Sequence, residues 1–136
     1  KGRLYVADRV NNRIQIFDTQ GNFLKQWTNI GSPWTLCIAN SPEQIMWVAD
    51  GYTNQVYKVY LAGNVLGKFG ETGRQPGQFL NVHGLACNAK NEVFGGETRN
   101  WRVQKLTFFF VGSDQPSTLA TCSCRQRAVI RYDCLM

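Results

Sequence analysis

The stretch "YVADRVNNRIQIFDTQG", residues 5–21, decides the fold class. It contains two short apolar runs that are separated by a polar turn and followed by a second turn. Apolar and polar residues alternate within each run with period two, which is typical of half-buried β-strands. Because a ribbon of two strands is only marginally stable in water, this unit must belong to a larger sheet.

The same plan recurs twice farther along the chain. The segment "WVADGYTNQVYKVYLAG" (47–63) carries Asp50 where the first copy has Asp8, an offset of 42 residues. The segment "VFGGETRNWRVQKL" (93–106) carries Glu97 after 47 more residues. Self-similarity at a spacing of roughly 40 to 50 residues indicates a repeat architecture, so the chain uses one structural unit about three times.

Each copy is expected to form a four-stranded antiparallel sheet. In the middle copy the predicted strands are 35–39, 45–49, 55–60 and 65–70, with clusters of turn-forming Asn, Ser, Pro, Asp and Gly between them. A helical period is not evident in windows of about ten residues, so the predicted class is all-β. Four short strands in about 40 residues are typical of a β-propeller blade.

Two of the turns between strands are expected to be fixed by an acidic residue. Asp8 and Asp50 each open a polar turn that ends at Asn12 or Asn54. An aspartate in such a position commonly accepts hydrogen bonds from backbone amides of its turn. The sequence therefore predicts the same role for both carboxylates.

Three segments resemble NHL repeats: "ADRVNNRIQIFDTQGNFLKQW" (7–27), "GRQPGQFLNVHGLA" (73–86) and "NWRVQKL" (100–106). The resemblance covers roughly residues 2–106 and implies three blades, at about 2–30, 31–70 and 79–106. NHL repeats imply a six-bladed propeller, of which three blades are one half. Since two-fold symmetry is the commonest way for identical chains to assemble, we expect a homodimer that completes the ring.

Residues 107–136 lack the NHL signature and form an atypical C-terminal tail. Within it, "STLATCS" (117–123) and "RAVIRY" (127–132) each have the pattern of a strand. The first predicted blade begins at its second strand and the third ends before its fourth strand. We therefore expect a strand from residues 117–132 to complete a blade, within the same chain or across the dimer interface.

Composition limits the partners that the chain is expected to bind. Its formal net charge is +6, but Lys and Arg are scattered among the strands beside acidic residues. This distribution favours solvated strand faces over a track for nucleic-acid phosphates. The longest apolar stretches are far shorter than the roughly 18 residues of a membrane span. A protein or peptide ligand is expected, and the sequence leaves the subcellular location unknown.

The five cysteines include no CxxC pair. Cys37 and Cys87 fall on the predicted first strands of two blades. A small buried thiol at such a position commonly packs as alanine does, and this role is expected for both residues.

One NHL family, peptidyl-α-hydroxyglycine α-amidating lyase and its bacterial relatives, is particularly similar to the chain. A zinc-binding histidine of that family opens the first strand of a blade, as His83 does in "NVHGLAC". An active-site arginine follows an Ala-Asp pair, as Arg9 does in "VADRVNNRIQ". The segment "DGYTN" (50–54) is similar to the one that carries the family's catalytic tyrosine, which makes Tyr52 a candidate. The family holds zinc with three histidines, whereas this chain contains one, and Trp34 occupies the corresponding place in the middle blade.

Two functions remain open at this point. The first is a non-catalytic binding scaffold without a cofactor, in which His83 is a polar cap at a blade join and Arg9 forms a surface ion pair. The alternative is a zinc-dependent lyase that cleaves peptidyl-α-hydroxyglycine to a peptide amide and glyoxylate, with Arg9 and Tyr52 catalytic and His83 a zinc ligand. Because a catalytic zinc usually needs three protein ligands, the single histidine favours the scaffold.

Overall fold

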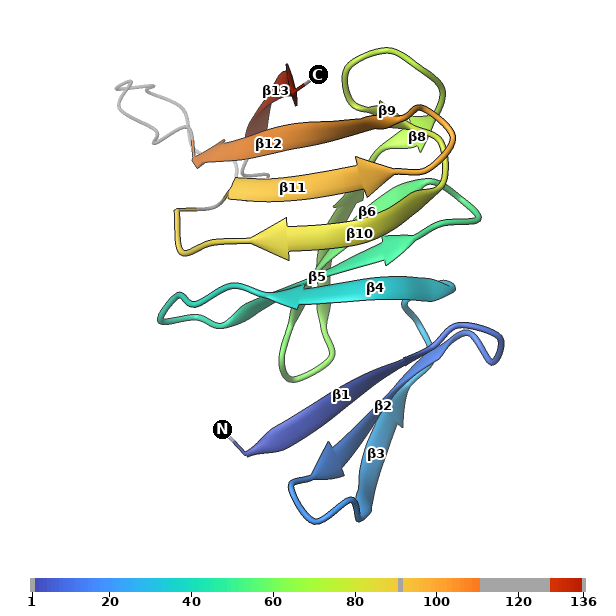
Figure 1. Ribbon diagram of the computed structural model, residues 1–136. Helices are drawn as coiled ribbons and strands as arrows, with labels where there is room; N and C mark the ends of the chain where they lie inside the picture. Colours follow the sequence, from blue (N-terminus) through green and yellow to red (C-terminus); the bar gives the residue numbers. More distant parts are fainter. Residues whose placement is uncertain (1, 91, 111–127, 136) are drawn as a thin grey trace, which may run out of the picture.

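The computed structural model describes residues 2–90, 92–110 and 128–135 and shows an all-β chain, without a helix in these residues (Figure 1). The described part accordingly contains no helix able to span a membrane. Its strands form three main antiparallel sheets, which confirms the predicted all-β class. The first sheet has the order β1 (Arg3–Asp8), β2 (Arg13–Asp18) and β3 (Phe23–Trp27).

The other two main sheets have four strands each. The middle sheet consists of β4 (Pro33–Ile38), β5 (Ile45–Asp50), β6 (Gln55–Tyr60) and β7 (Val65–Phe69), in that order. The third sheet consists of β10 (Val82–Cys87), β11 (Glu92–Glu97), β12 (Arg102–Phe110) and β13 (Ala128–Leu135). A short parallel pair, β8 (Glu71–Thr72) and β9 (Gln78–Phe79), lies in the connection between these two sheets.

The strand from the tail takes the fourth position of the third sheet. β13 pairs with β12 in antiparallel register from Val103↔Leu135 to Phe110↔Ala128. A strand of the tail therefore takes the fourth place of a sheet within the same chain, one of the two arrangements predicted for residues 117–132. The segment 117–123, for which a strand was also predicted, lies outside the described residues.

The three sheets share the register of one strand pair and the backbone conformation of the turn that joins it. In the first sheet Asp8 pairs with Arg13, in the middle sheet Asp50 pairs with Gln55, and in the third sheet Glu97 pairs with Arg102. The last residue of the intervening turn has a left-handed backbone in all three copies: φ is 52° at Asn12, 57° at Asn54 and 52° at Trp101. Asparagine tolerates this conformation well, whereas tryptophan at such a φ is unusual. The shared turn geometry therefore explains why asparagine occurs at this place in two copies.

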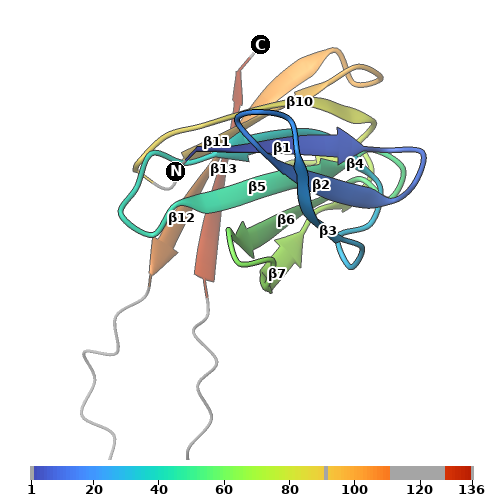
Figure 2. The same ribbon diagram turned by 90° about the horizontal axis from the view of Figure 1, so that it is seen from below.

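Side chains between neighbouring sheets form two hydrophobic clusters. Met46 and Val48 on one face of β5 pack against Ile14 and Ile16 of the first sheet. Trp47, on the opposite face of β5, belongs to a cluster shared with the third sheet. This alternation has the period of two that the sequence predicted, and it makes β5 fully buried. Seen from below, the first sheet lies over the middle one (Figure 2).

Cys37 and Cys87 form a disulfide that joins β4 to β10. The expectation that each would pack as a separate small thiol is therefore wrong. Their Cα atoms lie 6.0 Å apart, within the usual range for a disulfide, although 50 residues separate them in sequence. The pairing arises because the inner strands of the middle and third sheets lie side by side (Figure 1).

The two turn aspartates have different roles. Asp50 accepts hydrogen bonds from the backbone amides of Tyr52 (2.9 Å), Thr53 (3.1 Å) and Ser32 (3.1 Å), which confirms the prediction for this residue. Asp8 accepts hydrogen bonds from the side chains of Asn11, Arg13 and Gln15, so the prediction of backbone partners is wrong there. Hydrogen bonds from Arg13 and then Asn11 hold the pKa of Asp8 below its ordinary value, so this carboxylate is ionised at neutral pH.

Replacing Asp50 by alanine is expected to lower the free energy of unfolding by about 2 kcal/mol, because the turn loses a buried acceptor of three backbone amides and the amide of the buried residue Ser32 is left without a partner. Replacing Asp8 by alanine should cause a clearly smaller loss, because the side chains that donate to Asp8 can turn toward water. Urea denaturation of the two variants measures the difference. Equal losses of unfolding free energy in the two variants would show that it makes no difference to stability whether backbone amides or side chains donate to the aspartate.

Candidate functional site

Arg9, Tyr52 and His83 converge on the indole ring of Trp34, and we call these four residues the Trp34 cluster. The Arg9 guanidinium lies over the indole, with its Cζ atom 4.5 Å from the ring centroid. The rings of Tyr52 and His83 meet the indole edge to face, with centroids at 5.2 Å and 5.4 Å. Edge-to-face pairs and cations stacked on tryptophan are both favourable arrangements.

Trp34 and His83 reach this position because each sits at an irregularity near the start of its strand. In the middle sheet the register shifts between Pro33 and Thr35, and in the third sheet it shifts between Val82 and Gly84. Such a bulge redirects the side chain of the extra residue and is common near functional sites. Trp34 thus occupies in the middle sheet the position that His83 occupies in the third.

Gly51 allows the turn after β5 to pass close to the indole. A Cβ atom at this position would lie 2.5 Å from Cδ2 of Trp34, closer than van der Waals contact permits. The glycine therefore brings the neighbouring Tyr52 ring against the indole. Asp50 accepts a hydrogen bond from the backbone amide of Tyr52 and so also holds this turn in place.

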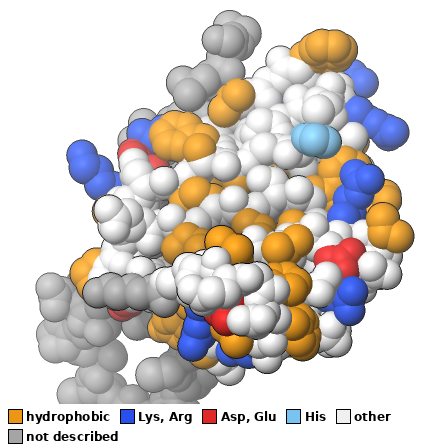
Figure 3. All heavy atoms as spheres, turned by 60° about the horizontal axis from the view of Figure 1, so that its bottom comes forward, with side chains coloured by type: hydrophobic (Ala, Val, Ile, Leu, Met, Phe, Trp, Pro, Cys, Tyr) orange, Lys and Arg blue, Asp and Glu red, His pale blue; other side chains and the backbone are white. Residues whose placement is uncertain are grey.

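The Trp34 cluster is open to solvent on one side. Tyr52 is 65% exposed, Arg9 and His83 are also exposed, and Trp34 is half-buried. The imidazole, the pale blue group in Figure 3, lies on the surface. The indole Nε1 of Trp34 is buried without a hydrogen-bond partner among the described residues. The surface thus offers a cation, an imidazole, a phenol and aromatic faces, which are groups suited to binding.

The residues of the cluster do not fit the zinc that the family resemblance implies. His83 is the one imidazole in the chain, and its ring packs against Trp34 rather than against another metal ligand. Arg9, on the other side of the indole, is cationic and would oppose a metal ion. Across residues 2–90, 92–110 and 128–135 there is no group of three His, Cys, Asp or Glu side chains placed to hold a metal. The cluster therefore does not support a zinc-dependent reaction.

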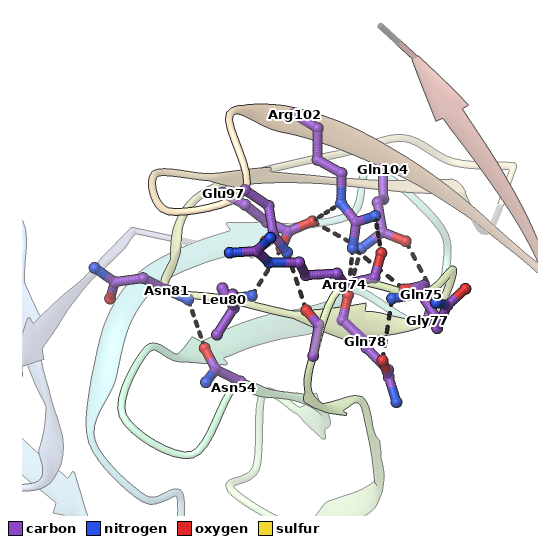
Figure 4. Close-up of polar contacts among 12 residues, drawn as sticks. Asn54, Arg74, Gln75, Gly77, Gln78, Leu80, Asn81, Glu97, Arg102 and Gln104 are labelled. Atoms are coloured by element: carbon purple, nitrogen blue, oxygen red, sulfur yellow. Dashed lines mark hydrogen bonds and ion pairs between the residues drawn. The ribbon is translucent and has the colours of Figure 1, made fainter.

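A second polar arrangement, the Glu97 clamp, lies on the third sheet and consists of Glu97, Asn100, Arg102 and Gln104. Figure 4 shows Glu97, Arg102 and Gln104 together with the connection that they contact. Asn100 Nδ2, Arg102 Nε and Gln104 Nε2 all donate to the Glu97 carboxylate, at 2.6, 2.7 and 2.8 Å. The Glu97 side chain is fully buried. The clamp is therefore a preorganised set of donors and acceptors around one buried charge.

The Glu97 clamp holds the connection that precedes β10 by its backbone. Its Asn100, Arg102 and Gln104 side chains donate to the carbonyl oxygens of Gly73, Arg74, Gln75 and Gln78, and its acceptors receive the amides of Gly77 and Leu80. Only backbone atoms of the connection take part in these bonds. Below the clamp, the Phe79 side chain is fully buried in the core between the middle and third sheets.

Sequence reasoning identified three members of the Trp34 cluster but missed its centre and the clamp. The sequence shows Trp34 only as the position equivalent to His83, because its role as the common contact depends on three sheets meeting. The clamp has a readable signal, because "DRVNNRIQ" (8–15) and "ETRNWRVQ" (97–104) share an acid followed by Asn, Arg and Gln at the third, fifth and seventh places. A shallow open pocket beside Gly70, Glu71 and residues 75–78 contains none of the predicted site residues.

Comparison with known proteins adds no assignment, since no family model and no curated protein matches the chain.

Proposed function

We propose that the chain is a three-blade part of an NHL-type β-propeller and that it serves as a non-catalytic binding scaffold. The support for blades is the repeated unit: three antiparallel sheets with the same register at the acid-bearing strand end and the same left-handed turn residue. The NHL-like segments of the sequence support the same assignment. On this proposal the ligand is a protein or peptide that contacts the Trp34 cluster.

The observation that carries this proposal is the convergence of the cluster from three sheets. Arg9 follows the last residue of β1, Tyr52 follows β5, and His83 belongs to β10. Each sheet contributes one exposed side chain to this surface. Because these side chains lie outside the hydrophobic cores, they can be substituted without changing how the sheets pack. Interface anchors in proteins are enriched in Trp, Tyr and Arg, the residue types found here.

The chemistry of the cluster favours a peptide that presents a carboxylate beside an apolar group. The Arg9 guanidinium can donate to a carboxylate while its plane stays on the indole, and the Tyr52 ring can cover an apolar side chain. A ligand carboxylate would also accept a hydrogen bond from an imidazole N–H of His83. Recognition would then rest on one charge-assisted contact and the aromatic surface around it.

Titration of the protein with paired peptides, identical except for Asp or Asn at one position and with an adjacent leucine, tests this function. We expect the Asp peptide to bind, and Arg9→Ala to weaken its binding by roughly tenfold or more, as is typical of a lost charge-assisted bond. Lys25→Ala is the matched control, because it removes an equal charge from a strand away from the cluster. The proposal fails if the Asp and Asn peptides bind equally or if Arg9→Ala leaves binding unchanged.

A second copy of the chain is the proposed means of closing the ring. The outer face of the first sheet exposes Leu4 and Val6, which occupy the positions of the buried Met46 and Val48 in the middle sheet. The outer face of the third sheet exposes Val103, which occupies the position of the buried Ile14. The two outer faces therefore correspond to the two sides of a sheet-to-sheet contact that already exists within the chain. Light scattering should give twice the 15.4 kDa chain mass, and a folded monomer at micromolar concentration would exclude this closure.

A further inference from the structure

The first sheet carries a second version of the Glu97 clamp, the Asp8 clamp, made of Asp8, Asn11, Arg13 and Gln15. Asn11 Nδ2, Arg13 Nε and Gln15 Nε2 donate to the Asp8 carboxylate at 2.8, 2.6 and 2.9 Å. These are the same three inner bonds that Asn100, Arg102 and Gln104 make to Glu97. The inner bonds of the Asp8 clamp are therefore formed, although none of the described residues occupies the place that the connection 73–80 takes on the Glu97 clamp.

The side chains of the Asp8 clamp are more exposed to solvent than those of the Glu97 clamp. This difference is expected if the Glu97 clamp is occupied by its connection and the Asp8 clamp is open. In the Glu97 clamp the side chains of Arg102 and Glu97 are 14% and 0% exposed. In the Asp8 clamp the side chains of Arg13 and Asp8 are 31% and 17% exposed. Arg13 uses Nη1 to bind Gln26 Oε1 at 2.9 Å, and its Nη2 makes no hydrogen bond within the described part of the chain. Nη2 of Arg13 is thus available, and its counterpart in the other clamp binds the backbone carbonyls of Gln75 and Gln78.

The strand that bears Asp8 also has an open edge. The first sheet has the order β1-β2-β3, so β1 pairs on one side only, whereas the equivalent strands β5 and β11 pair on both sides. An unpaired edge is a template for adding a strand from another segment. In the third sheet this inner place is filled by β10, the strand that directly follows the clamped connection. The open edge and the Asp8 clamp are therefore placed to receive one continuous segment.

The apolar positions of β1 indicate which side chain that segment should carry. Where the third sheet has Gly95, the connection contributes the buried Phe79, and a Cβ atom on Gly95 would lie 3.5 Å from the Phe79 ring. Where the middle sheet has Val48, the equivalent connection contributes the smaller Ile30, buried in the same cluster. The first sheet has Val6 at this position, and Val6 is 44% exposed. The matching side chain is accordingly aliphatic.

We propose that the Asp8 clamp and the open edge of β1 together bind a polypeptide segment with a glycine-containing turn, then an isoleucine or leucine, then an extended strand. The turn would present its carbonyl oxygens to Arg13 and Gln15, the aliphatic side chain would cover Val6, and the strand would pair with β1. This site lies on the outer face and edge of the first sheet. It is separate from the Trp34 cluster and does not depend on the ligand proposed there.

The test uses a peptide with the sequence GETGRQPGQILNVHGLA, which is residues 70–86 with isoleucine in place of Phe79. We expect saturable one-to-one binding by calorimetry, with changes in the amide resonances of residues 3–8. Arg13→Ala should weaken binding by roughly tenfold or more, since charge-assisted bonds are lost. Lys25→Ala is the control of equal charge and should bind the peptide as the unchanged protein does. The peptide that keeps phenylalanine should bind more weakly.

Several results would overturn the proposal. One is the absence of saturable binding at about 1 mM peptide, an affinity too weak for recognition. A second is equal binding by Arg13→Ala and the unchanged protein, and a third is binding whose resonance changes lie outside β1. Light scattering without peptide tests whether a second copy of the chain supplies the strand that pairs with β1. A dimer that Arg13→Ala dissociates would replace the peptide by a second copy of the chain as the occupant.

Discussion

Replacement of Glu97 by alanine is expected to lower the free energy of unfolding by about 3–5 kcal/mol, the range measured when one partner of a buried ion pair is removed. The Glu97 side chain is fully buried and accepts from three side chains and from the Leu80 amide. Without it, the Arg102 guanidinium and the Gln104 amide lose their common acceptor in a buried place. The connection 73–80 should also detach, because the clamp positions both of these side chains against its carbonyl groups.

Denaturant titration measures this loss, and Glu92→Ala serves as the matched control. Glu92 lies at the other end of the same strand and pairs with Lys105 at 2.6 Å, but both side chains are partly exposed. Water can replace an exposed ion pair at little cost, so the control should remain close to the unchanged protein. Similar midpoints for the two variants would show that the buried clamp does not stabilise the third sheet.

Removal of the disulfide between Cys37 and Cys87 is expected to lower the free energy of unfolding by about 4 kcal/mol. The bond closes a loop with a sequence separation of 50 residues, and cross-linking a loop of this length restricts the unfolded chain by about that amount. The double variant Cys37→Ala, Cys87→Ala avoids leaving a free thiol. Thermal and urea denaturation of this variant, compared with the oxidised protein, measure the loss.

Peptide mapping without reductant provides the direct check that this disulfide forms. A fragment that contains Cys37 should be linked to one that contains Cys87. Labelling of both thiols in the native, oxidised protein, or an unchanged midpoint in the double variant, would contradict the assignment. The replacement Ser32→Ala near the start of β4 is a useful control, because it changes that strand's surroundings without altering the cross-link.

The sequence by itself determined the strands and their turns. The predicted strand 55–60 is observed with the same bounds, and those at 35–39, 45–49 and 65–70 differ by one or two residues. Each depends on alternation of apolar residues within the strand and on residues such as Asn54 that accept a left-handed backbone. These are properties of neighbours in sequence, so they can be read without knowing how the sheets meet.

The candidate site was predictable only in part. Arg9, Tyr52 and His83 could be chosen from local motifs, but their meeting at Trp34 depends on bulges in two strands and on the stacking of three sheets. The zinc role suggested for His83 depended on further ligands, and its ring instead faces an indole. A motif specifies which group is present, whereas the surrounding elements specify what that group contacts.

Tertiary structure alone decided the contacts between distant segments. Asp50 accepts a hydrogen bond from the amide of Ser32, which belongs to the segment before β4 and lies 18 residues earlier in the chain. Cys37 and Cys87 pair because two inner strands lie side by side, an arrangement that depends on the packing of apolar faces between sheets. Hydrogen bonds and disulfides act over a few ångströms, so their formation depends on which distant segments are brought together, and local sequence does not contain that information.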